Sequence, residues 1–412
     1  MTIASSNFVT LAYQEETTIG TLPSSGAFRY TPLTGESLQF SKDSISSNNI
    51  NSTRQISDVI QTGFNVAGGT EIELANKGFD ELMEGALWGD WSTAVDEDFL
   101  ATELTVVAAT GTITASGTAT PTFATDLVTG QFVQITGMAE SGNNGIFQVE
   151  SITSELIIVV LDPDSVLVDG TSGASGRLCA SMMRNGVSPH GYTFEKSLSD
   201  LTPVQMFNYL GCRVNSMSIS AQSSSIITGS FDFMGETSSA YTTGTESTDA
   251  VVDAVDGNIL NAVSHIGGVK IDGEDQEAAG IYFQGIDFTL SNNLRGIQAI
   301  GTVGNIGVSP GQMEVTGSIN AYFIDDTMYE KFTGDTEFSL SYQVIDDSGE
   351  GFVFSFPRVV ITSEDMSASG NDTDMIENMS WSAMMSLSTD IAPSITIQID
   401  RFYLDYSDVP DA

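Results

Sequence analysis

Apolar and polar residues alternate along many short segments of this chain. Between residues 70 and 74, for example, apolar side chains alternate with the carboxylates of Glu71 and Glu73. Such alternation is typical of a β-strand with one buried face and one wet face. Similar runs occur at residues 217–220, 230–233, 286–288, 313–323 and 351–356, between clusters of Gly, Ser, Asn and Asp. The pattern predicts a mainly β, antiparallel fold.

Helical spacing is confined to a few segments. In the clearest, residues 76–87, apolar side chains recur every three or four positions, with Asn76 as a cap and Gly89 as a stop. A second helix is expected to begin near Asp325 or Asp326. A third short helix is predicted over residues 203–210, because proline suits the first turn of a helix and glycine its end.

The chain repeats itself, since residues 38–87 resemble residues 286–332. In each copy a short strand leads to Ser-Asn-Asn, then to a strand that begins at glycine, then to a helical segment. The tails also match, with Arg213-Val214 corresponding to Arg358-Val359. The repetition predicts two copies of one β-rich unit, each an antiparallel β-sandwich with one flanking helix.

Residues 104–180 have no counterpart in the second copy and are predicted to form a small inserted all-β domain facing outward. Its expected strands are residues 112–115, 131–136, 145–152 and 156–161, with a hairpin turn at Asn143-Asn144-Gly145. Lys and Arg are absent from residues 104–176, so the insert is acidic. The predicted domains are therefore residues 1–103 plus 181–235, the insert, a linker and entry strand at 236–285, and a second unit at 286–412.

Charge narrows the possible functions. The 412 residues carry 13 Lys+Arg against 54 Asp+Glu, a formal net charge of -41, yet 41% are hydrophobic and 22 are Phe. That apolar content favours a folded chain over a disordered one. A surface this negative repels phosphates, so specific recognition of nucleic acid is not expected.

Cys179 and Cys212 are the two cysteines, and we expect free thiols, although one bridge between them is an alternative. A basic start followed by an apolar run is absent from the N-terminus, and no run of about eighteen apolar residues occurs. These features predict a soluble protein made in the cytoplasm, with no membrane partner.

The sequence offers few candidates for catalytic or metal-binding residues. His190 and His265 are isolated and are interpreted as ordinary loop histidines, because zinc needs clustered ligands. The acidic run at residues 272–277 is the most calcium-like segment, but a solvated turn is favoured, and residues 346–349 are interpreted as a hairpin turn. Paired carboxylates of a glycoside hydrolase stay open, although no pair stands out. We expect no enzyme, no catalytic residues, no cofactor and no metal site.

The alternating strands allow two arrangements. One is an ordinary sandwich with a solvated face, and the other is a set of sheets that join edge to edge across subunits to enclose a channel. An ordered set of segments resembles the tail tube proteins, or major tail proteins, of long-tailed bacteriophages, and this resemblance favours the arrangement that encloses a channel. The segments are residues 38–41, 47–49, 54–58, 69–74, 88–91, 210–215, 291–294, 317–323 and 356–358. The insert, chiefly at residues 142–147, resembles the small β-modules that decorate such tails.

The resemblance implies a structural virion protein whose rings stack into a tube for DNA. Most members have one tube domain and form six-membered rings, so two fused units imply a homotrimeric ring with approximate sixfold symmetry. Residues 41–66 and 291–312 would then contact neighbouring rings, through Ser47, Asn48, Asn49, Arg54, Ser291, Asn292, Asn293 and Arg295. Carboxylates would line the channel and keep DNA from adhering: Glu71, Glu73, Asp232, Asp287 and Glu314.

The implied partners are further copies of the chain, tail terminator, tape measure and baseplate proteins, and translocating double-stranded DNA that is not bound specifically. The implied location is the virion tail, assembled in the bacterial cytoplasm. The main alternative is a secreted or cell-surface β-sandwich adhesin that binds calcium or glycans. A virion-associated hydrolase is a third hypothesis, and halophilic adaptation is another explanation of the charge.

Overall fold

The computed structural model of the chain describes residues 3–24, 26–50, 52–116, 123–154, 156–161, 166–242, 250–252, 257–366, 370–371, 374–388 and 394–403. The fold is mainly β, as the alternation predicted, and almost all strand pairs are antiparallel. Short 3-10 turns occur at Ser6–Phe8, Ala108–Thr110 and Ser141–Asn143. Among the described residues, no helix combines the length and the apolar character needed to cross a membrane.

We call the strands around the first repeat the first unit. Its elements are β1 (Val9–Glu15), β2 (Ala27–Tyr30), β3 (Gly35–Glu36), β4 (Gln39–Ser46), β5 (Val59–Glu73), α1 (Asp80–Leu87), β13 (Tyr192–Leu198), β14 (Gln205–Gln222), β15 (Thr228–Gly235), β16 (Thr237–Thr242) and β17 (Ala250–Val252). One layer contains β4, β5, β15 and the second half of β14. The other contains β2, β1, β13, the first half of β14 and β16.

The second unit repeats this plan. Its elements are β18 (Ile266–Ile271), β19 (Glu274–Asp275), β20 (Phe283–Ser291), β21 (Arg295–Gln298), β22 (Asn305–Ser309), β23 (Glu314–Tyr322), α3 (Thr327–Thr333), β24 (Phe338–Ile345), β25 (Gly351–Asp365), β26 (Ile376–Ala383) and β27 (Gln398–Arg401). One layer orders its strands β20, β23, β26 and the end of β25. The other contains β18, β24, the start of β25 and β27.

The two units are joined through one sheet. Strand β14, at the edge of its layer in the first unit, pairs with β20, at the edge of its layer in the second unit. The pairing runs from Ser216 opposite Ser291 to Gln222 opposite Gly285. The order is therefore β4-β5-β15-β14 followed by β20-β23-β26-β25, so one set of four strands is repeated within a single sheet. On one face of this sheet a single apolar cluster runs through both units, and it includes Phe231, Ile219, Phe288 and Trp381.

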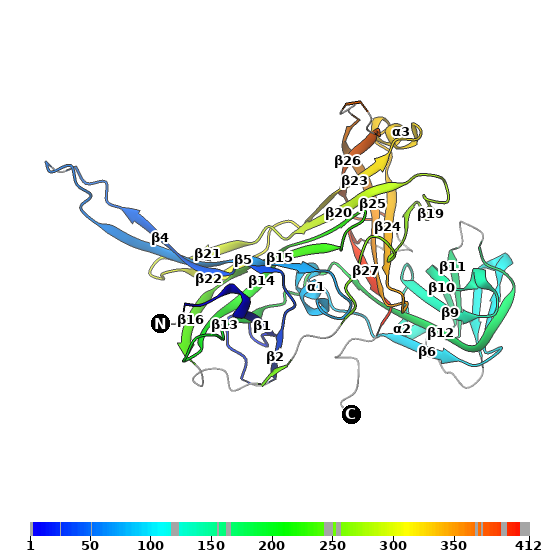
Figure 1. Cartoon of the computed structure of the whole chain (residues 1–412), viewed down its shortest axis with the longest axis horizontal. Coiled ribbons are helices and arrows are strands. Elements are labelled where there is room, and N and C mark those ends of the chain that lie inside the picture. Colours follow the sequence, from blue (N-terminus) through cyan, green and yellow to red (C-terminus); the bar gives the residue numbers. More distant parts are fainter. Residues whose placement is uncertain are drawn as a thin grey trace.

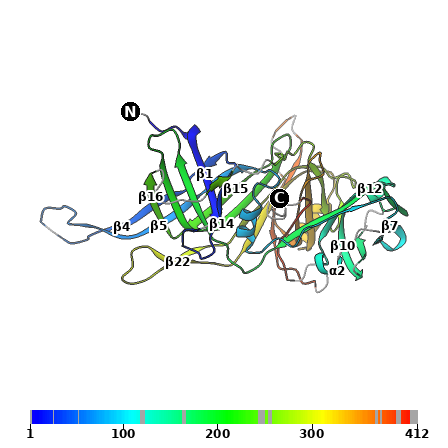
Figure 2. The same ribbon diagram turned by 90° about the horizontal axis from the view of Figure 1, so that it is seen from below.

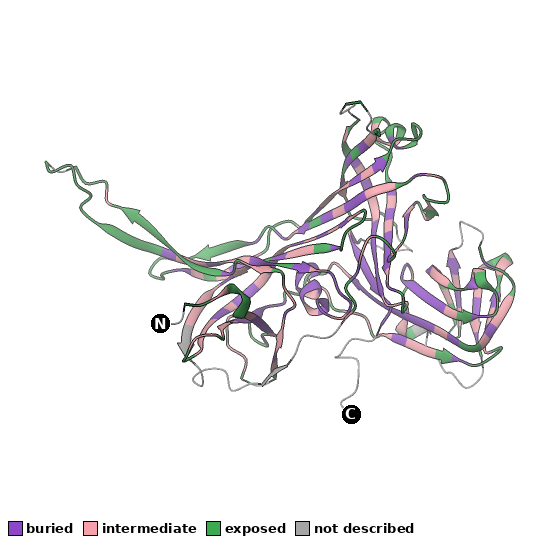
Figure 3. Ribbon diagram, in the orientation of Figure 1, coloured by how far each residue is buried: buried purple, intermediate pink, exposed green. Residues whose placement is uncertain are grey.

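Two hairpins leave the sheet on the same side. The longer, β4–β5, is here called the arm, and it projects far from the body of the molecule (Figure 1). The shorter, β21–β22, extends beside it (Figure 2). They touch, because a Cβ at Gly304 would lie 2.4 Å from the ring of Phe64 on β5. Exposed residues dominate the arm, whereas buried and half-buried residues make up most of the sheet at its base (Figure 3).

The insert has its own apolar cluster, from Val95 to Ala180. Its elements are β6 (Val95–Phe99), β7 (Leu104–Val107), β8 (Thr112–Ala115), α2 (Phe123–Asp126), β9 (Phe132–Met138), β10 (Gly145–Ser154), β11 (Ile157–Leu161) and β12 (Gly170–Arg184). The four strands expected from turn spacing are present. The cluster begins about nine residues before the expected boundary at 104, because β6 pairs with β12. The end of β12 pairs with β27 and so reaches the second unit.

Two expectations from local pattern were wrong. Residues 205–210 form the start of β14 rather than a helix, because pairing with β13 on one side and β16 on the other outweighs the helical signals of proline and glycine. Much of the expected linker is paired strand as well, since β18 bonds to β24 and β16 to β14. The predicted helices α1 and α3 are present, but α1 begins at Asp80 and ends with Trp88 in a left-handed conformation.

A buried ion pair joins the two units. The Arg401 guanidinium on β27 lies 2.9 Å from the Asp80 carboxylate at the start of α1, and both side chains are at most 2% exposed. The Tyr403 hydroxyl donates to the same carboxylate at 2.7 Å, and Arg401 stacks on the Trp91 ring at 4.4 Å. Removing Arg401 would take its guanidinium away from a carboxylate that stays buried.

We therefore expect Arg401→Met to lower the free energy of unfolding of the unassembled chain by about 3–5 kcal/mol. Urea unfolding followed by circular dichroism measures this change. The matched control is Arg295→Met, because Arg295 is exposed on β21 and should change stability little. A loss as small as that of the control would show that the pair does not stabilise the junction.

Candidate functional surface

One face of the shared sheet is polar across six strands. Residues directly opposite one another in neighbouring strands share a face, so the pairings define three rows. The first row is Glu73, Thr228, Ser220, Asp287, Ser318 and Ser380; the second is Glu71, Ser230, Ser218, Thr289, Thr316 and Ser382; the third is Gly69, Asp232, Ser216, Ser291 and Glu314. We call these rows the polar face. All five carboxylates predicted as channel lining lie on it.

Hydroxyl groups hold some of these carboxylates in place. Ser216 Oγ donates to Asp232 at 3.0 Å, and the backbone N–H of Ser318 donates to Asp287 at 3.2 Å. Ser318 Oγ also donates to Asp287 at 2.5 Å. Glu71, Asp232 and Glu314 are exposed, while Glu73 and Asp287 are half-buried. The surface therefore combines fixed negative charges with small neutral hydroxyls.

The opposite face of the same strands is the core. Thr70, Ile72, Phe231 and Met217 are each at most 1% exposed, and they alternate with the residues of the polar face. The same alternation continues in β20 and β23 with Phe288 and Ile319. Because a shift of one residue would exchange the two faces, burial of these apolar side chains fixes the direction in which the carboxylates point.

The three rows of the polar face contain no Lys or Arg. Two basic groups lie near these rows in the described sheet: Arg358 on β25, whose guanidinium pairs with Glu337, and Arg213, which lies one row beyond, opposite Met234. The Arg213 guanidinium donates to the Val308 carbonyl at 2.5 Å and lies 3.8 Å from Glu236. Since β22 and Glu236 already occupy this guanidinium, it is not presented to the polar face.

Most of the residues predicted as ring contacts are exposed on the two hairpins, but Asn292 is buried. Asn48, Asn49 and Arg54 are exposed near the end of the arm, and Ser47 is half-buried there. Asn293 and Arg295 are exposed at the base of the second hairpin. Asn292 is only 6% exposed, and its carboxamide donates to the carbonyls of Ala86 and Val214 inside the chain. Its role is at the junction of the two units, which local pattern could not reveal.

Exposed apolar side chains add a signal that the sequence reading missed. Ile45, Ile56, Val59 and Ile60 on the arm are 57–68% exposed, and Ile50 is fully exposed. Ile297, Ile300, Val303 and Ile306 on the shorter hairpin are at least 43% exposed. Apolar groups gathered on two neighbouring hairpins mark a surface for protein contact. In the shorter hairpin these residues recur every third position between turn residues, a pattern that is visible in the sequence.

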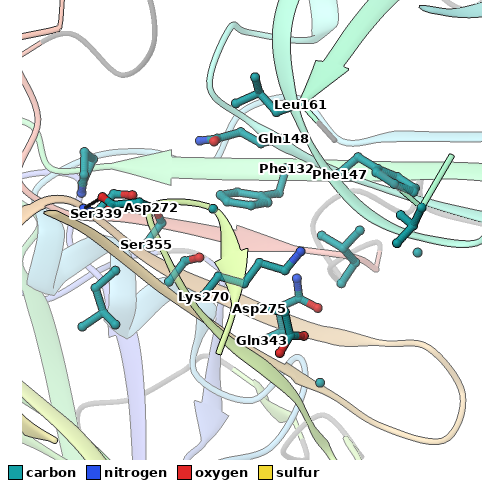
Figure 4. A pocket seen from close by; sticks show the side chains of 18 of the residues that line it. Phe132, Phe147, Gln148, Leu161, Lys270, Asp272, Asp275, Ser339, Gln343 and Ser355 are labelled. Carbon is teal, nitrogen blue, oxygen red and sulfur yellow. Dashed lines mark hydrogen bonds between the residues drawn. The ribbon is translucent and has the colours of Figure 1, made fainter. Parts of the chain in front are cut away.

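A groove of about 840 Å³ lies between the insert and the second unit (Figure 4). Phe132 and Gln148 line it from the insert, and Lys270, Asp272 and Gln343 from β18, its turn and β24. The Asp272 carboxylate accepts from the backbone of Ser339 and pairs with Lys331, so it holds the β18–β19 turn against the strands beside it. Asp272 therefore has a structural role at this turn.

The structure places the other candidate groups in local contacts. His190 bonds to Glu15 at 2.7 Å, which raises its pKa, and His265 bonds to Asn261. Cys179 and Cys212 are both free and buried, and burial raises the pKa of the Cys179 thiol to about 12. In the part of the chain that the structure describes, no three His, Cys, Asp or Glu side chains converge as metal ligands.

Comparison with known proteins gives one match. The model of a family described as phage tail tube protein matches residues 6–383, which is nearly the whole chain and includes both units and the insert. No curated protein matches the chain.

Proposed function

The chain belongs to the phage tail tube protein family, and from that premise we propose that three copies close into a ring, that the rings stack into the tail tube, and that the polar face lines its channel. Membership makes the protein a structural component of the virion tail, in a family that assembles with itself. The ring of three, the lining and the stacking contacts are our proposal.

The order of strands in the shared sheet carries this proposal. One set of four strands is followed by a second set, and β14 of the first pairs with β20 of the second. The outer strands of this series are β4 and the end of β25, and each has a free edge among the described residues. Unpaired strand edges favour pairing with another chain. Pairing β25 of one copy with β4 of the next would repeat the internal junction.

The register of that contact can be worked out from the internal one. In both units an aromatic residue lies opposite a glycine, Phe233 opposite Gly68 and Trp381 opposite Gly317. Counting from these anchors along the paired strands, Ser363 on β25 corresponds to Ser216, and Ser41 on β4 corresponds to Ser291. The same count pairs Val214 with Ile361, so the match of Val214 with Val359 expected from the sequence is shifted by two residues. Since Ser216 lies opposite Ser291, Ser363 of one copy should lie opposite Ser41 of the next.

Closure at three copies would place six equivalent units around one axis, because each chain contributes two. A heterologous contact repeated by rotation closes into a ring, whereas an open helix would grow without limit. In such a ring the apolar cluster lies outside the sheet and the polar face lies inside. The bore would carry carboxylates and hydroxyls, and it would offer DNA phosphates no cation to bind.

The arm and the shorter hairpin leave the sheet on the same side, so they are suited to reach the next ring along the axis (Figure 1). Their exposed isoleucines would be buried there. We expect the tube to pass double-stranded DNA without specific binding, and to meet tail terminator, tape measure and baseplate proteins at its ends. The insert lies away from the polar face and is proposed to face outward.

A cysteine pair tests the lateral contact. Directly opposite residues of antiparallel strands lie about 4.5–5.5 Å apart, which a disulfide can span. We expect oxidised Ser41→Cys/Ser363→Cys protein to give covalent dimers and trimers, with a ladder that stops at three on a non-reducing gel. The native cysteines are buried and should not interfere.

The matched control is Ser41→Cys/Ser382→Cys, because Ser382 lies on the polar face one strand further in and should not form the link. A ladder that continues beyond three chains would contradict the closed ring. Absence of any link in assembled protein would contradict the lateral contact itself.

A further inference from the structure

Two carboxylates lie on the core side of the sheet at the free edge of the second unit. Glu364 on β25 is opposite Met379, and Glu377 on β26 is opposite Ala321, so both share the face of buried apolar residues. Glu377 is 3% exposed. One carboxylate oxygen of each is buried without a hydrogen-bond partner in the described structure.

At the positions that correspond to Glu364 and Glu377, the first unit has no carboxylate. The residue that corresponds to Glu364 is Met217, because each lies opposite the core residue two positions before the aromatic anchor, Met379 and Phe231 respectively. Burial, together with the charges of Glu364 and Asp325, raises the pKa of Glu377 to about 7. An unpaired carboxylate in an apolar setting is unfavourable unless a cation or hydrogen bond reaches it. The second unit therefore has acidic groups at and beside its free edge strand, β25.

The register of the lateral contact identifies the group that would meet them. Leu290 lies opposite Met217 at the internal junction, and Leu290 corresponds to Phe40 on β4. Phe40 of the next copy should thus lie opposite Glu364. Lys42, two residues later on the same face of β4, would be the diagonal neighbour of Glu364, a separation that long side chains cross.

Lys42 is suited to this role. It is exposed on β4, where it lies opposite Phe64, and it forms no ion pair with any residue that the structure describes. It corresponds to Asn292, whose buried carboxamide donates across the internal junction to the carbonyl of Val214 and to that of Ala86 in α1. Lys42 at the junction between chains and Asn292 at the junction within a chain would thus each supply a hydrogen-bond donor to the preceding unit.

We propose that Lys42 of one copy forms an ion pair with Glu364 of the next copy, and that this contact neutralises the acidic edge of the second unit when rings close. The proposal rests on the lateral contact between β25 and β4. It distinguishes the junction between chains, which is charged, from the junction within a chain, which is apolar at Met217.

Charge exchange tests the pair. Lys42→Glu and Glu364→Lys should each slow tube assembly about tenfold or more, because like charges then meet at a desolvated edge. The double variant Lys42→Glu/Glu364→Lys should restore assembly, measured by light scattering and electron microscopy. The matched control is Arg54→Glu/Glu364→Lys, which alters an arginine of the arm tip and should not restore it.

Two further measurements keep the outcome clear. Thermal unfolding of each unassembled variant shows whether it folds, and the neutral pair Lys42→Gln/Glu364→Gln replaces the charge exchange if lysine at 364 does not fold. If Ser41→Cys/Ser363→Cys forms links but neither pair of substitutions restores assembly, the ion pair is overturned and the lateral contact stands. If no links form, both are overturned.

Discussion

Replacing residues 47–58 with Asn-Gly is expected to abolish tube growth while the chain stays folded. Asn-Gly suits a two-residue hairpin turn, and Ser46 already lies opposite Val59, so the shortened arm can close without strain. The replaced segment includes Ile50 and Ile56, which are exposed in the single chain. If these side chains are buried against the next ring, their loss removes much of the apolar contact that holds rings together.

Electron microscopy and sedimentation of the purified variant measure this effect, with rings or single chains expected in place of tubes. The matched control is Val187→Ser, because Val187 is 90% exposed on a loop away from the arm and its loss should leave assembly unchanged. Circular dichroism should show equal melting temperatures for the unaltered chain, the chain with the shortened arm and the Val187→Ser control. Tubes of normal length from the shortened chain would exclude the arm as the stacking contact.

The second large effect is expected from lysine on the polar face. Glu71→Lys, Asp232→Lys and Glu314→Lys, combined in one chain, should leave tubes assembled but lower infectivity by about two orders of magnitude or more, because each lysine adds a phosphate contact in every copy along the bore. These three side chains are exposed, so the substitutions should not disturb the core. Plaque titre of phage complemented with the variant measures delivery.

Two controls separate adhesion from a general change of charge. Glutamine at the same three positions removes the carboxylates without adding cations, and it should reduce titre far less. Lysine at Asp98 and Glu150, which are exposed on the insert, changes the charge in the same direction, with two substitutions instead of three, outside the proposed channel. Equal losses from the insert and the polar face would show that the lining assignment is incorrect, and so would normal titre from the triple variant.

Much of this architecture was predictable because strand facing is encoded locally. Alternation around Glu71, Asp232 and Asp287 was sufficient to assign the wet side, and the structure places all five predicted carboxylates on one surface. The two units were predictable because the same short strings recur in the same order. The four strands of the insert followed from turn spacing.

Non-local pairing was not predictable in the same way. Nothing near Pro203 in the sequence reveals that β13 and β16 flank the next residues and hold them as strand. The junction of β14 with β20, the use of Asn292 within it and the buried pair of Asp80 with Arg401 all depend on residues far apart in the chain. The free edges of β4 and β25 become apparent only when the order of the strands is known.

A reconstruction of the purified polymer by electron cryo-microscopy tests the central claim most directly. The account predicts rings of three chains and six equivalent units, with Ser363 of each copy opposite Ser41 of the next and with Glu71, Asp232 and Glu314 pointing into the bore. A ring of another size, an unpaired β25 edge, or a polar face directed to the outside of the tube would contradict it.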